Sequence, residues 1–290
     1  MPQPSAQPDP SRACYTDAVH YGRMSVAESR SDGFYEMTYC LAVKVSDGIV
    51  FASDSRTNAG VDYVSTFSKM HIFSVAEDRL FVLLTSGNLA TTQAVINGIQ
   101  RDLETESEST NLRTVKYLFD AAHYIGELSQ RAQRVHAHSL QKDHVNMEAS
   151  FILGGQIAGR AHKIYMIYPE GNYITVSEET PYLQIGETKY GKPILDRIIT
   201  SNTSLEDAAR CALVSIDSTM RANISVGPPV ELAIYRKDEM RIYQRLNLKY
   251  DTPYFTALGK RWSEGLRRAF DRLPRFDWEQ TRRADDSLSN

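Results

Sequence analysis

The chain has 290 residues, of which 42% are hydrophobic and 24% charged, which is an ordinary composition for a globular protein with a sizeable core. Its formal net charge of −3 gives no overall positive field, so we expect neither nucleic acid nor a membrane surface as a partner. Apolar runs such as 80–84 are far shorter than the roughly 20 residues of a membrane span, and the three cysteines show no ligand-like spacing, so a soluble cytoplasmic protein is expected.

Three segments are predicted along the chain. Residues 1–37 show little periodicity and are rich in turn formers, so they are predicted to be a disordered or removed leader. A start of translation at Met37 is a further hypothesis for this segment. Residues 38–250 are predicted to form one domain, and residues 251–290 a helical C-terminal extension that packs on the core or on a neighbouring subunit.

The first half of the domain is predicted to consist of strands followed by helices. Alternating β-favouring residues predict two antiparallel hairpins, the first turning at Asp47-Gly48 and the second at Glu77-Asp78, with strands at 39–45, 49–52, 69–75 and 79–85. Apolar residues spaced three and four apart then predict helices over 88–103 and from about Leu112 to the region of His136.

The second half repeats this order. Strands are predicted at 149–153, 162–168 and 182–185, with an interruption at Gly154-Gly155, and helices follow at 190–199 and 205–221. A closing hairpin at 230–236 and 241–246 precedes a helical segment over 253–279. Because strands and helices occur in groups rather than in alternation, the sequence predicts an α+β fold, a four-layer α/β/β/α sandwich of two antiparallel sheets.

Three motifs near the start of the domain point to a known family. Thr38 stands at its first strand, the DG turn leads to the Asp-x-Arg of Asp54 and Arg56, and Lys69 follows in the run Ser-Lys-Met-His. This order and spacing resemble the opening of proteasome β-type subunits and, within them, the Anbu family, over about residues 38–246. The resemblance implies an N-terminal-nucleophile hydrolase, a threonine-type peptidase of the protein-degradation class.

The resemblance also implies a role for each of these side chains. Thr38 is the expected nucleophile, activated by its own α-amine, whose ordinary pKa of about 7.7 to 8.0 leaves a useful neutral fraction. Lys69 would lie beside the hydroxyl and favour a developing alkoxide, Asp54 would hold Lys69 charged, and Arg56 would brace the strand. A Gly-rich turn at Ser86 and Gly87 would supply N–H donors to the substrate oxyanion.

Two supporting positions depart from the proteasome pattern. Where that family has a serine after an Ile/Val-Gly pair, this chain offers either Glu187 or Thr188. Where the family has an Arg-Asp-x-x-Ser-Gly run, this chain keeps Ser225 and loses the aspartate. Both changes predict an altered hydrogen-bond network around the nucleophile.

Partners follow from the same resemblance. We expect a peptide or amide substrate and a homo-oligomer, as a ring or an open helix, with an unfoldase partner left open. The mechanism requires no cofactor, and no metal site is predicted, since the i, i+2 spacing of His136 and His138, with His144 nearby, does not place their rings on one helix face.

Three other interpretations stay open. One is a small-molecule amidase or acylase of the same fold, and another is a non-catalytic scaffold subunit. Thr38 could also be an ordinary strand residue, with Asp54 and Lys69 as a structural ion pair.

Overall fold

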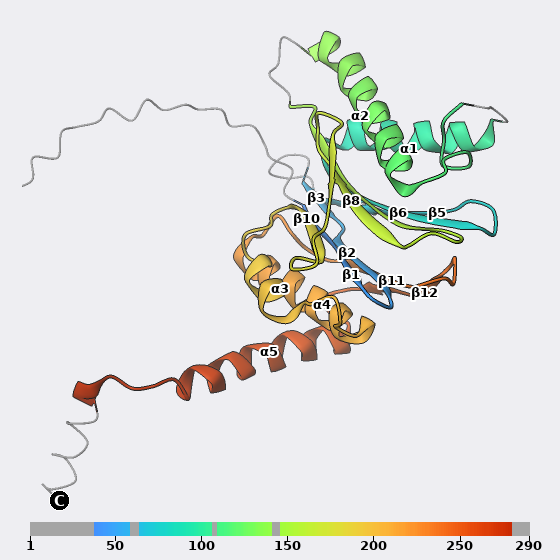
Figure 1. Ribbon diagram of the computed structural model, residues 1–290. Helices are drawn as coiled ribbons and strands as arrows, with labels where there is room; N and C mark the ends of the chain where they lie inside the picture. The colour runs from blue at the N-terminus through green and yellow to red at the C-terminus, as the bar shows by residue number, and fades with distance from the viewer. Residues whose placement is uncertain (1–37, 59–63, 106–108, 141–145, 280–290) are drawn as a thin grey trace, which may run out of the picture. The chain divides into compact units, whose positions relative to one another are not determined.

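The structure is a computed structural model that describes residues 38–58, 64–105, 109–140 and 146–279. The predicted leader over 1–37 and residues 141–145, which include His144, lie outside the described residues, as do the side chains of His136 and His138. Seventeen helices and strands are found in the described part. Figure 1 shows their arrangement.

Two five-stranded antiparallel sheets form the centre of the fold (Figure 1). The first sheet has the strand order β10-β1-β2-β11-β12, with bounds Tyr182–Gly186, Tyr39–Val45, Gly48–Asp54, Val230–Arg236 and Ile242–Leu248. The second has the order β5-β6-β7-β8-β9, with bounds Met70–Ser74, Arg79–Gly87, Ala149–Ile157, Lys163–Ile167 and Tyr173–Thr175. A separate two-stranded ribbon pairs β3 (Arg56–Asn58) with β4 (Val64–Thr66).

Helices cover the outer face of each sheet. One buried cluster packs the strands β5, β6, β7 and β8 against α1 (Leu89–Glu104) and α2 (Leu118–Leu140). A second joins the other sheet with α3 (Lys192–Ile198), α4 (Leu205–Ala222) and the start of α5 (Pro253–Asp271). A third cluster, which includes Phe51, Ile152 and Tyr235, lies between the sheets. The predicted four-layer α/β/β/α sandwich is therefore confirmed.

Local sequence explains where the two long amphipathic helices of the outer layers begin. Asn88 caps α1, because its side chain accepts a hydrogen bond from the Thr91 N–H at 3.1 Å. Ser204 caps α4 in the same way through the Asp207 N–H. These caps satisfy backbone donors that the first turn leaves unpaired.

Several predicted boundaries were wrong for identifiable reasons. The helix expected from Leu112 begins at Leu118, because the Asn111 side chain accepts from the N–H groups of Arg113 and Thr114 and holds that stretch in turns. The strand expected to break at Gly154 continues through it. A Cβ there would lie 2.5 Å from the Phe51 ring, so the glycine allows the sheets to approach.

The two predicted N-terminal hairpins belong to different sheets. β1 pairs with β2, and β5 pairs with β6, but the pairs face each other across the central layer. The short strands β3, β4 and β9 were not predicted, since three residues show no measurable alternation.

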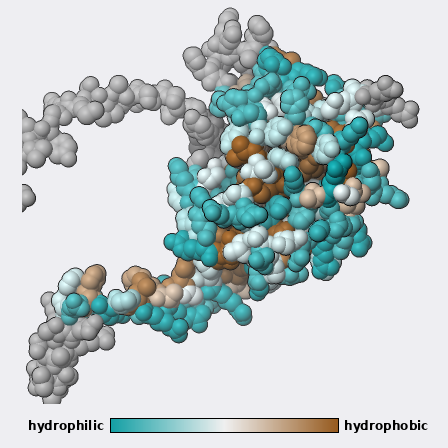
Figure 2. Space-filling model, viewed as in Figure 1, coloured by the Kyte–Doolittle hydropathy of each residue, from teal (hydrophilic) through white to brown (hydrophobic). Residues whose placement is uncertain are grey.

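The last helix is shorter than predicted and only partly packed. It ends at Asp271, three residues before Pro274, rather than continuing to Glu279. Phe255 is buried and Trp262 is half-buried, whereas Leu266 and Phe270 are 53% and 71% exposed. Figure 2 shows apolar side chains along this helix among hydrophilic ones. Packing on the core therefore involves only its first turns.

No described helix is both long and apolar enough to cross a lipid bilayer.

Candidate active site

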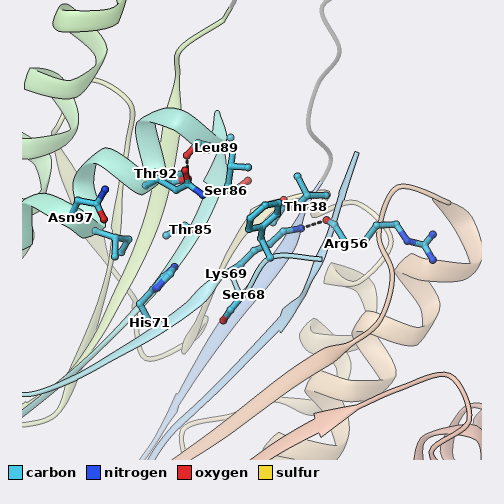
Figure 3. Close-up of a pocket in the computed structure, with 15 residues that line it drawn as sticks. Thr38, Arg56, Ser68, Lys69, His71, Thr85, Ser86, Leu89, Thr92 and Asn97 are labelled. Carbon is cyan, nitrogen blue, oxygen red and sulfur yellow. Dashed lines mark hydrogen bonds between the residues drawn. The ribbon is translucent and has the colours of Figure 1, made fainter. Parts of the chain in front are cut away.

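The predicted catalytic residues meet where strands from both sheets end. Thr38 directly precedes β1, Asp54 ends β2, Lys69 directly precedes β5, and Gly87 ends β6. Thr38, Lys69, Ser86 and Gly87 line one cavity of about 260 Å³. Figure 3 shows the side chains of Thr38 and Lys69 in this cavity. The fold thus joins motifs that are up to 49 positions apart in the chain.

Lys69 is held by two oxygen atoms. Its ammonium donates to Asp54 Oδ1 at 2.8 Å and to the Arg56 carbonyl at 2.6 Å, the latter marked in Figure 3. Lys69 is 7% exposed and Asp54 fully buried, so the pair is shielded from water and salt. The ammonium is therefore fixed in position at the cavity wall.

Asp54 joins three separate stretches of the chain. Besides Lys69, its Oδ1 accepts from the Tyr39 N–H at 3.1 Å, and its Oδ2 accepts from the Gly227 N–H at 3.2 Å. Burial raises the pKa of Asp54, and Lys69 with the two N–H donors opposes that shift. Since one carboxylate oxygen binds both Lys69 and the amide next to Thr38, the ammonium is kept close to the predicted nucleophile.

The Gly-rich turn lies at the predicted place. Gly87 has φ +99°, and a Cβ there would lie 2.4 Å from the Glu148 carbonyl oxygen, so only glycine fits this backbone. The turn passes directly from β6 into the Asn88 cap of α1. Its backbone therefore borders the cavity at a helix N-terminus, where partial positive charge favours an anion.

Arg56 lines the cavity, but its guanidinium binds elsewhere, on the loop around Gly227. Figure 3 shows its guanidinium directed away from Lys69. The group donates to the Ile224 carbonyl and, at 3.3 Å, to the Tyr250 hydroxyl. It also covers Gly227, where a Cβ would lie 2.4 Å from the guanidinium carbon. Arg56 thus fixes the loop that supplies a donor to Asp54.

The two other predicted supporting residues lie outside the cavity lining. The Glu187 N–H donates to the Thr38 carbonyl at 2.6 Å, and its carboxylate accepts from Asn223 Nδ2 at 3.2 Å. The same Asn223 accepts from the Ser225 N–H at 2.9 Å. Glu187, rather than Thr188, thus contacts the backbone of Thr38, the predicted nucleophile.

Some residues around the site were not predicted. Asn223, Gly227 and Tyr250 come from far along the chain, and no local pattern relates them to Asp54. His71 could have been found, because it lies two residues after Lys69 and lines the same cavity.

Cys40, next to the site, is not a competing nucleophile, since burial raises the pKa of its thiol. The described residues contain no group of three or more His, Cys, Asp or Glu side chains placed to hold a metal ion.

Gly186 gives a test of how tightly the backbone of Thr38 is held. It has φ +83°, and a Cβ there would lie 1.8 Å from the Thr38 carbonyl oxygen. We expect Gly186→Ala to lower the free energy of unfolding by at least about 3 kcal/mol and to slow any reaction at Thr38. The matched control is Gly159→Ala, which has φ +73° and open space around it. This control should lower the free energy of unfolding, measured by thermal unfolding, by only about 1 kcal/mol. Equal losses for both variants would contradict a tight fit at Gly186.

Comparison with known proteins establishes the class to which this chain belongs. The profile of the proteasome subunit family matches residues 37–235, so the chain belongs to the proteasome subunit family. Within that family it is an Anbu family member, as the solved structures show.

The relatives with solved structures are similar over almost their whole length. Anbu (ancestral beta-subunit) from Yersinia bercovieri is 43% identical, with 83% of this chain and 99% of that one covered and a TM-score of 0.77. The Anbu complex from Pseudomonas aeruginosa, described as a helical assembly, is 44% identical, with coverages of 82% and 98% and a TM-score of 0.78. Anbu from Hyphomicrobium sp. strain MC1 is 42% identical, with coverages of 83% and 100% and a TM-score of 0.75. The comparison with curated proteins found no match.

Proposed function

We propose that the protein is a threonine-type peptidase or amide hydrolase in which Thr38, once the preceding residues are removed, attacks the substrate carbonyl. The observation that carries this proposal is that Thr38, Gly87 and a Lys69 ammonium held by Asp54 border one cavity. A scaffold subunit has no need of a buried ammonium in the same cavity as Thr38, because a buried ion pair adds little to stability.

The proposed reaction uses the chain's own groups only. The free α-amine of Thr38 takes the hydroxyl proton, and the oxygen forms a bond to the carbonyl carbon. Lys69 disfavours protonation of the amine and stabilises the alkoxide, while N–H groups at the Gly87 turn stabilise the oxyanion. The protonated amine gives its proton to the leaving nitrogen, and water then hydrolyses the ester.

We further propose that it works in the cytoplasm as a homo-oligomer that encloses its sites. The helical assembly of the Pseudomonas aeruginosa relative and the exposed apolar side chains of α5 support this. A peptide is favoured over a small amide, because the cavity extends from Thr38 along one face of α1 as far as Asn97.

A peptide epoxyketone tests the proposal directly, because this electrophile bonds both a hydroxyl and an adjacent free amine. The chain is produced in a native-type host, its intact mass is measured, and the adduct is mapped by mass spectrometry. We expect an N-terminus at Thr38 and one adduct on that residue. An N-terminus upstream of Thr38, or a processed protein that forms no adduct, would sink the peptidase proposal and favour the scaffold interpretation.

A further inference from the structure

The catalytic cavity has a second end, away from Thr38, that the proposed reaction does not use. Figure 3 shows His71 and Asn97 at this end. One face of α1 forms much of the wall, through residues spaced three and four apart: Leu89, Thr92, Gln93, Ile96 and Asn97. Because the helix fixes their spacing, these side chains face any group that enters this end of the cavity.

Three polar side chains of this end are uncommitted. The side chains of His71, Gln93 and Asn97 make no hydrogen bond with any other described part of the chain. By contrast, the Thr92 hydroxyl donates to the Leu89 carbonyl at 2.9 Å, and the Ser68 hydroxyl donates to Glu231 at 2.6 Å. The three free groups can therefore both donate to and accept from a ligand.

This end of the cavity offers a ligand no available charged side chain at neutral pH. Among the described residues that line it, none is acidic, and its two cations are engaged: Lys69 by Asp54 and Arg56 by the Ile224 carbonyl. Burial, and secondarily Arg245, lowers the pKa of His71, while Glu231 opposes the shift. His71 is therefore a neutral imidazole that donates from one nitrogen and accepts at the other.

We propose that this end of the cavity binds the substrate side chain on the acyl side of the cleaved bond, and that His71, Gln93 and Asn97 select a glutamine-type carboxamide there. This inference rests on the proposed peptidase function. A carboxamide donates and accepts, as these three groups do. The isosteric carboxylate of glutamate only accepts and loses its hydration without gaining a cation. The thioether of methionine has the same length but leaves the polar groups unpaired.

The test uses three epoxyketone peptides that differ only in the residue next to the electrophile, which is Gln, Glu or Met. The second-order rate of Thr38 labelling is measured for each at pH 7.5. We expect the Gln peptide to label roughly 10-fold faster than the other two, because each mismatch leaves a donor or acceptor without its partner. A wild-type protein that labels equally fast with Met or Glu would overturn the selectivity while leaving the peptidase function intact. A protein that labels with none of the three would remove both.

Variants identify the selecting groups. Gln93→Leu and Asn97→Leu change exposed helix positions and should fold normally, and each should shift the preference from Gln toward Met. Gln100→Leu is the matched control, since Gln100 is exposed on the same helix but does not line the cavity. It should keep the wild-type preference. His71→Leu should have the largest effect, because His71 is the most buried of the three. A Gln preference unchanged in all cavity variants would contradict the assignment.

Discussion

Replacing Lys69 with methionine is expected to lower the free energy of unfolding by about 3–5 kcal/mol and to abolish reaction at Thr38. The loss arises because Asp54 is fully buried and would keep no cation within reach. The side chain must then take up a proton or leave the core. Denaturant unfolding of the single variant against the parent protein measures this cost.

The double variant Asp54→Asn/Lys69→Met separates stability from activity. It removes both charges, so most of the lost stability should return, whereas labelling of Thr38 should not. Lys192→Met provides the matched control at an exposed pair, where Lys192 and Asp196 lie 2.9 Å apart and about half exposed. This control should lower the free energy of unfolding by at most about 1 kcal/mol. If the double variant is as unstable as Lys69→Met, the unpaired charge of Asp54 is not the cause of the lost stability.

Thr38→Ala is expected to lower hydrolysis or labelling at least about 1000-fold, with a change of less than about 1 kcal/mol in unfolding free energy. The reason is that the substitution removes the attacking oxygen and leaves Lys69, Asp54 and the Gly87 turn in place. Kinetics with an electrophilic peptide and thermal unfolding measure the two effects together.

Thr38→Ser is the matched variant for this experiment. It keeps the hydroxyl and the α-amine and should keep measurable reaction. Equal reactivity of the Ala variant and the parent protein would show that another group is the nucleophile. Loss of reaction in the Ser variant as well as in the Ala variant would indicate that the amine is blocked by retained upstream residues.

The layers of the fold could be predicted because the elements that build them are long and periodic. Helix α1 and the paired strands β1 and β2 each present enough apolar positions to reveal their period. The strands β3, β4 and β9 span three residues each and depend on tertiary pairing alone. The assignment of hairpins to opposite sheets depends on which faces meet in the core, which no local pattern contains.

The candidate site was predictable to the extent that its residues lie in short motifs. Thr38, Lys69 and Gly87 all border the N-terminal hairpins and line one cavity, and Asp54 binds Lys69. Glu187 and Ser225 were predicted as support; both bind Asn223, neither lines the cavity, and the Glu187 N–H also donates to the Thr38 carbonyl. Tyr250 binds Arg56 across 194 positions, a separation over which a single sequence gives no signal.

The three donors of Asp54 also set an order in which the site can be completed. Two of them, from Tyr39 and Lys69, are present early in synthesis, but the third belongs to Gly227. A ribosome must therefore add more than 150 further residues after Lys69 before the carboxylate has all its partners. The nascent chain carries the predicted catalytic residues long before their electrostatic setting is finished.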